Sequence, residues 1–199
     1  MNQTMSIRKS FHRTSAIGIL IILANALLIS WSVAFAEFIG EPPQKRPASD
    51  ETEVKAVFLF NFAQFVEWPS SKLPADSAIV IGVLGKDPFG KYLDETVANE
   101  IVNGHPLKIE RYANMKHIGK CHILFINPGR SIKVDDVINR LKGKNILTVS
   151  DETGFSKQGG MIHFVTESNR IKLRVNLGSV KESEISVSSK LLSLAEIVD

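Results

Sequence analysis

Five aromatic side chains stand among aliphatic ones in residues 54–69, and Pro69 closes this run. At the spacing of an α-helix, six of the apolar residues fall on one face, which is typical of a helix that packs against a core. These six are Val54, Phe58, Leu59, Phe62, Phe65 and Val66. We therefore expect a buried amphipathic helix from about Glu51 to Trp68, and the rest of the chain must supply the surface that covers it.

Three apolar residues of the same stretch, Val57, Phe60 and Trp68, project near the polar side of this helix. An isolated domain would place charges there, so either another element covers these side chains or they contact a partner. Phe155 presents the same alternative, because it lies in a polar loop with three glycines and is either a plug into the core or an exposed contact. We predict that these four residues contribute to self-association or partner contacts.

The first 36 residues have the three regions of a secretory signal peptide. Arg8, Lys9 and Arg13 form the basic region, residues 16–29 form the apolar region, and residues 34–36 place small side chains before a cleavage site. We expect export and cleavage after Ala36. An uncleaved anchor is the alternative, but about 14 apolar residues are short for a bilayer core of ~30 Å.

Residues 37–50 contain three prolines and several charges, which predicts an extended lead-in, and residues 51–199 have the length of one domain. Three of the 24 basic residues lie in the expected signal peptide, so the remainder carries 21 basic and 21 acidic side chains. This balance gives no electrostatic reason to expect nucleic acid as a partner. Cys121 is the one cysteine, so an intrachain disulfide is excluded and a buried apolar role is expected.

Strand-like and helix-like patterns alternate after the aromatic helix. Strands are expected at residues 78–84, 107–112, 122–126 and 146–149, and helices at residues 87–99 and 134–141. This alternation predicts a single α/β domain with a mostly parallel sheet and flanking helices. Near the C-terminus, residues 161–165 and 171–177 flank a polar turn, which predicts an antiparallel β-hairpin at one sheet edge. A terminal amphipathic helix is expected from Leu191, Leu192, Leu194, Ala195 and Val198.

Asp87, Asn127 and Asp151 each follow a predicted parallel strand, at the sheet edge where α/β proteins bind ligands. Each residue also has a structural explanation, as a helix cap or a turn residue. The three therefore define a candidate ligand crevice for an alternative function, the binding of a small solute. The sequence contains no nucleophile elbow, and no catalytic acid pair is fixed by close spacing, so we do not expect an enzyme.

Two further sequence patterns suggest a phosphate site and a metal site but do not support either one. Residues 85–91 match the phosphate-loop pattern, but Tyr92 replaces the magnesium-binding hydroxyl and Pro88 removes a backbone N–H, so we interpret the segment as a helix cap. His117, Cys121 and His122 would need one helix to converge on a metal, whereas the last two lead into a strand. We therefore predict neither a metal nor a cofactor.

Eight motifs in order resemble the YfiR family of periplasmic proteins over residues 54–198. The motifs are VKAVFLFNFAQFVEWP (54–69), IGVLGKDPFG (81–90), CHILFI (121–126), ILTVSD (146–151), GF (154–155), GGMIHF (159–164), NRIKLRVNL (169–177) and SSKLLSLA (188–195). The resemblance implies an exported, non-catalytic α/β domain that is often a homodimer.

The resemblance also implies a function and its partners. It points to a repressor that binds the periplasmic sensor region of an inner-membrane diguanylate cyclase and so lowers cyclic-di-GMP signalling. An outer-membrane lipoprotein would sequester the repressor and release the cyclase. The chain departs from the best-understood members in having a single cysteine, so a redox-sensing intrachain disulfide cannot form. From the residues alone, the alternative remains a periplasmic small-solute-binding domain that feeds a membrane sensor.

Overall fold

The computed structural model describes residues 48–198, with side chains from residue 51 onward. The expected signal peptide and nearly all of the expected lead-in lie outside these residues. Within them no helix is both long enough and apolar enough to cross a membrane.

Helix α2, Ala48–Phe65, is the aromatic helix that the sequence predicts. Leu59 and Phe62 on its inner face are fully buried. The Phe62 ring stacks on Phe164 of the sheet with centroids 5.9 Å apart, so an aromatic contact fixes the helix to the core. The helix is shorter at its C-terminal end than predicted, because the next two residues form strand β1, Val66–Glu67, which pairs with β9, Ser186–Val187.

Eight strands form the main sheet, in the order β10-β8-β7-β6-β5-β2-β4-β3. Their bounds are Ile79–Gly85 (β2), Ile101–Val102 (β3), His105–Tyr112 (β4), Ile123–Asn127 (β5), Leu147–Ser150 (β6), Ile162–Glu167 (β7), Arg170–Asn176 (β8) and Ala195–Val198 (β10). Strands β4, β2, β5, β6 and β7 run parallel, whereas β3 and β8 are antiparallel to their neighbours β4 and β7. The α/β fold with a mostly parallel sheet is therefore confirmed.

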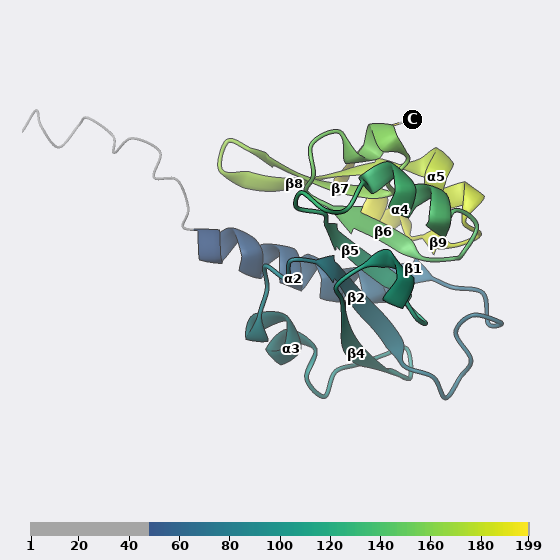
Figure 1. The fold of residues 1–199 in the computed structure, drawn as a ribbon. Coiled ribbons are helices and arrows are strands. Elements are labelled where there is room, and N and C mark those ends of the chain that lie inside the picture. Colours follow the sequence, from purple (N-terminus) through teal and green to yellow (C-terminus); the bar gives the residue numbers. More distant parts are fainter. Residues whose placement is uncertain (1–47, 199) are drawn as a thin grey trace, which may run out of the picture. The chain divides into compact units, whose positions relative to one another are not determined.

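Helices cover both faces of this sheet. One apolar cluster joins α2 and α3, Lys91–Val97, to the inward side chains of the strands, and α5, Leu177–Glu182, and α6, Ser189–Leu192, add to it. The second cluster joins the other face to α4, Val134–Leu141, and to the 3-10 turn η2, Phe155–Gln158. Figure 1 shows α2 and α4 on opposite sides of strand β5.

The C-terminal hairpin is confirmed, but its place in the sheet is not the expected one. Ser168 and Asn169 join β7 to β8 with positive φ angles of 48° and 61°, as in a type I′ turn. Strand β8 was expected at the edge, yet β10 lies beyond it and pairs with it in parallel. The edge prediction failed because β10 itself was expected to be a helix.

The predicted terminal amphipathic helix is wrong beyond its first turn. Ser188 accepts the Leu191 N–H and caps the short helix α6, which buries Leu191. Residues 195–198 are extended instead, and the β-branched Ile197 and Val198 suit a strand. Pairing of this segment with β8 therefore outweighs the helical spacing of the leucines.

The helix after β2 also begins later than expected. Asp87 was predicted to cap it directly, with Pro88 as its first residue. The Asp87 carboxylate instead accepts the N–H groups of Phe89 at 2.7 Å and Gly90 at 3.3 Å, which makes a separate turn before α3.

Candidate functional site

The carboxyl ends of the parallel strands hold the three residues of the predicted crevice. Asp87 follows β2, Asn127 ends β5, and Asp151 follows β6. Neighbouring strands end together, since Gly85 pairs with Asn127 and the Ser150 hydroxyl donates to the Ile126 carbonyl at 2.7 Å. The three residues thus lie at the same, carboxyl-terminal end of the parallel strands. That they line one common ligand crevice remains a prediction.

Asp87 and Asn127 are engaged in structural contacts. The Asp87 carboxylate accepts from Arg111 Nε at 2.6 Å, and the same guanidinium reaches Asp94 at 2.6 Å. The hydrogen bond from Arg111 holds the pKa of Asp94 below its usual value. These contacts tie α3 to β4. The Asn127 amide donates to the Lys86 carbonyl at 2.8 Å and closes the turn after β2.

Asp151 lines an open cavity of about 510 Å³. Its walls come from the N-terminal half of α2, from the loop after β6 and from strands β7 and β8. The charged and titratable side chains on these walls are Glu51, Lys55, Asp151, Lys157, His163 and Arg174.

The cavity exists because β6 is shorter than its neighbour β7. The two strands pair only through Val149 with Ile162 and through Ser150 with His163. Strand β7 continues to Glu167, and the β7–β8 hairpin projects beyond the end of β6 (Figure 1). The edge of β7 that faces β6 therefore has no strand beside it along its outer half.

Lys55 is the residue of this cavity that sequence reasoning missed. It is only 8% exposed, and its Nζ lies 2.6 Å from Asp151 and 2.9 Å from Glu51. Burial disfavours the ammonium, but the hydrogen bonds to Asp151 and Glu51 outweigh it and raise the pKa of Lys55. A signal was present, because Lys55 shares a helix face with Leu59 and Phe62, where a lone charge needs a partner.

His163 also lines the cavity and is 7% exposed. Burial and, less strongly, the nearby Arg174 lower the pKa of its imidazole. The Nδ1 atom is buried without a hydrogen-bond partner among the described residues, which fits a neutral ring with its proton on Nε2. The ring packs edge-on against Phe155 with centroids 6.5 Å apart.

Of the four residues predicted to contact a partner, two are exposed or half-buried and two are buried. Val57 is 40% exposed on the outer side of α2, and Phe60 is half-buried next to the core. Phe155 is fully buried against α4 and the sheet, so its placement at a contact surface is wrong and the plug alternative holds. Trp68 is 9% exposed and packs edge-on against His122 at 5.7 Å, because the chain leaves the helix at Val66 and turns this ring inward.

The residues considered as metal ligands do not converge. His117 is exposed in the turn η1, Met115–His117. Cys121 is buried, donates to the Ile123 carbonyl at 3.0 Å, and burial raises the pKa of its thiol to about 12. The His122 Nδ1 accepts the Val80 N–H at 3.0 Å. Across residues 48–198 no three His, Cys, Asp or Glu side chains are placed to hold a metal ion.

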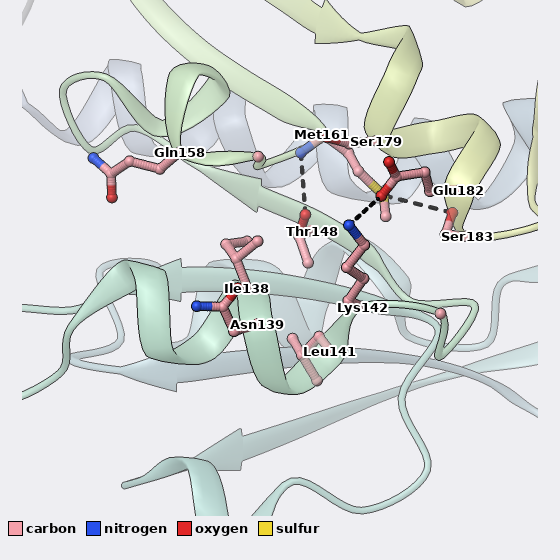
Figure 2. A pocket seen from close by; sticks show the side chains of 12 residues that line it. Ile138, Asn139, Leu141, Lys142, Thr148, Gln158, Met161, Ser179, Glu182 and Ser183 are labelled. Atoms are coloured by element: carbon pink, nitrogen blue, oxygen red, sulfur yellow. Dashed lines mark hydrogen bonds and ion pairs between the residues drawn. The ribbon is translucent and has the colours of Figure 1, made fainter.

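A second, smaller cavity of about 160 Å³ lies between α4 and α5. Figure 2 shows Lys142, directly after α4, reaching Glu182 of α5, with 2.9 Å between Nζ and the carboxylate. Below this ion pair, the Thr148 hydroxyl accepts the Met161 N–H at 3.1 Å. Both polar pairs are thus satisfied within the protein, and Asn139 and Gln158 are further polar residues of the lining.

Comparison with known proteins identifies the family. The sequence profile of the YfiR/HmsC-like family matches residues 52–196, which is most of the chain. The chain belongs to the YfiR/HmsC-like family. No curated protein matches the chain.

Membership in the YfiR/HmsC-like family sets the functional class. The family comprises periplasmic, non-catalytic regulators of diguanylate cyclase signalling, and the predicted resemblance is confirmed. The match begins in the second turn of α2 and ends within β10, so the part of the helix that carries Val57 and most of the cavity beside Asp151 belong to the family's domain.

Proposed function

We propose that the chain represses an inner-membrane diguanylate cyclase by binding its periplasmic sensor region, which lowers the level of cyclic-di-GMP. The family match carries this proposal. The outer side of α2 supports it, because Val57 and the half-buried Phe60 are three residues apart and so are neighbours on the helix surface. Exposed apolar side chains grouped in this way favour contact with another protein.

The repression is tested by deleting the gene in the source cell and measuring cyclic-di-GMP. We expect the level to rise, and to fall again when the wild-type gene is restored. An unchanged level in the deletion strain would contradict the proposal.

The surface is tested by restoring the gene as Val57→Asp. A carboxylate in the centre of an apolar contact must lose its water, so this variant should fail to lower cyclic-di-GMP. Ile101→Asp is the matched control, since Ile101 is 68% exposed at the far edge of the sheet. If both variants restore repression equally well, the contact lies elsewhere than on α2.

Three further points belong to the proposal. An outer-membrane lipoprotein would relieve the repression by sequestering the chain, and the chain would act as a homodimer. Export to the periplasm would be accompanied by cleavage of the signal peptide after Ala36. Mass spectrometry of the mature protein from the periplasm should then find an N-terminus at Glu37, and an N-terminus at Met1 would contradict cleavage.

The cavity beside Asp151 favours one alternative, the binding of a small solute that feeds a membrane sensor. Both charge signs line it, so a charged small molecule is the expected class of ligand. A metabolite panel in a thermal-shift assay tests this, because a ligand at a hundred times its Kd adds ~2.7 kcal/mol of stability. The shift should be lost in Lys55→Ala, compared with that variant's own melting temperature without ligand.

A further inference from the structure

Strand β10 leaves one lateral edge of the main sheet uncovered. It pairs with β8 over Ala195–Val198, and no other strand of residues 48–198 lies on its outer side. The opposite edge is formed by the two-residue strand β3 and, beyond it, by β4, where the exposed charges of Lys108, Glu110 and Arg111 protect the edge. An open strand edge is a template for pairing with another chain.

The register shows which backbone groups point outward. The two-residue turn closes at Glu167 and Arg170, which therefore form a hydrogen-bonded pair. Because the direction of these groups alternates along β8, the N–H and C=O of Leu173 and Val175 point toward β10. In the parallel register, Glu196 and Val198 then bond to β8, and the N–H and C=O of Ala195 and Ile197 point away from the sheet.

The side chains do not protect this edge. Ile197 is 43% exposed and the preceding Leu194 is 68% exposed, which makes two of the four exposed large hydrophobic residues in the described domain. Natural edges are commonly protected by Lys, Pro or a bulge. The one charge on β10, Glu196, is held by Arg174 Nε at 2.9 Å and so stays beside β8.

We propose that a second copy of the chain covers β10 by antiparallel pairing about a twofold axis that passes beside Ile197. Such an axis lets the exposed edge pair with an identical edge. Each Ile197 N–H then donates to the Ile197 carbonyl of the other copy. This register places the two Ile197 side chains together and Glu196 opposite Val198. A register centred on Glu196 would place like charges directly opposite each other, which is destabilising.

This inference locates the self-association that is part of the proposed function, but it is tested on the purified protein alone, without a cyclase. Pairing of one short strand together with the flanking Leu194 buries little surface, so the dimer should be weak and reversible. Its sedimentation coefficient should rise with protein concentration. If the purified protein does not dimerise, the proposed repression of the cyclase is still untested. If the protein dimerises but does not repress the cyclase, the dimer proposed here still stands.

Sedimentation velocity of two lysine variants tests the surface. Ile197→Lys should remain monomeric at concentrations where the wild type is dimeric, whereas Ile101→Lys, at the other edge, should dimerise as the wild type does. A wild type that is monomeric at every concentration overturns the proposal. An Ile197→Lys variant that dimerises normally, or a dimer broken by Ile101→Lys instead, overturns it equally.

A cysteine variant tests the register and covers the case in which Ile197→Lys misfolds. Hydrogen-bonded antiparallel partners have Cα atoms about 5.5 Å apart, within the range of a disulfide. Mild oxidation of Ile197→Cys should therefore give a covalent dimer on a non-reducing gel. The wild type should give none, because Cys121 is buried, and neither should Ile101→Cys. No cross-link through position 197 would overturn the register.

Discussion

At the scale of single residues, Gly160 shows how closely the loop before β7 is packed. A Cβ atom at this position would lie 2.2 Å from the Phe155 ring, which is itself fully buried. Replacing Gly160 with Ala should therefore force the ring or the backbone to move and cost about 1–3 kcal/mol of unfolding free energy. Urea unfolding of the variant and the wild type measures this difference.

Gly119 provides the control for this prediction. No atom lies within 4 Å of a Cβ built there, and its φ angle is not in the left-handed region. Gly119→Ala should change the free energy of unfolding by no more than about 0.5 kcal/mol. Equal effects of the two substitutions would mean that the Phe155 ring can yield without cost.

The same pair explains why sequence reasoning left Phe155 undecided. The glycines around it indicated a backbone with special conformations but not the direction of the ring. That direction depends on the close approach of Gly160 and on the apolar residues of α4, which are adjacent only in the folded chain. The wrong inference for Trp68 has a similar origin, because its orientation follows from the pairing of β1 with the distant β9.

At the scale of elements, Lys55 joins α2 to the end of β6 through an ion pair 96 residues apart in sequence. Lys55→Ala would leave Asp151 and Glu51 facing each other without a cation between them. We expect the free energy of unfolding to fall by about 1–3 kcal/mol, between the values for surface and buried pairs, because both carboxylates keep partial access to water. Chemical denaturation measures the change.

Lys157 is the matched control on the same cavity wall, because it is exposed and forms no ion pair with the described residues. Lys157→Ala should stay within about 0.5 kcal/mol of the wild type. A loss as large as that of Lys55→Ala would show that the cavity's total charge matters, rather than the link between α2 and β6.

Helices and strands with a strong hydrophobic pattern were predictable from the sequence. Those whose conformation depends on pairing with a distant strand were not. The helix Val134–Leu141 has its predicted bounds, since its apolar residues repeat at helical spacing. The buried strands β2 and β5 were visible as continuous apolar runs. Strand β10 was not, because leucines at helical spacing precede it and its partner β8 is distant in sequence. The Asp151 cavity was only partly predictable, since its shape depends on how far β7 extends beyond β6.

At the scale of the whole molecule, two buried histidines make stability depend on pH. His122 lies beside Trp68, and His163 lies on the other face of the sheet beside Phe155. Burial lowers the pKa of both imidazoles below the ordinary value of 6.5. Both rings are therefore neutral in the folded protein at neutral pH.

The sign of the effect follows from proton binding. Below the ordinary pKa the unfolded chain binds protons that the folded chain does not, so acid favours unfolding. The stabilisation is complete above the ordinary pKa and is lost as the pH falls toward the folded pKa values. Within that window each histidine should lower the free energy of unfolding by about 1.4 kcal/mol per pH unit.

Urea unfolding at a series of pH values from neutral to mildly acidic tests this dependence. His163→Gln should reduce the slope of the free energy of unfolding against pH by the contribution of one histidine. This reduction is expected whatever the effect of the substitution on stability at neutral pH. His117→Gln, at an exposed position, should leave the slope unchanged. A His163→Gln curve parallel to that of the wild type would show that the ring becomes charged without unfolding the domain. The bare Nδ1 would then have to gain a water molecule or a carboxylate as its partner, and Asp151, which lines the same cavity and acts electrostatically on this imidazole, is a candidate for that role.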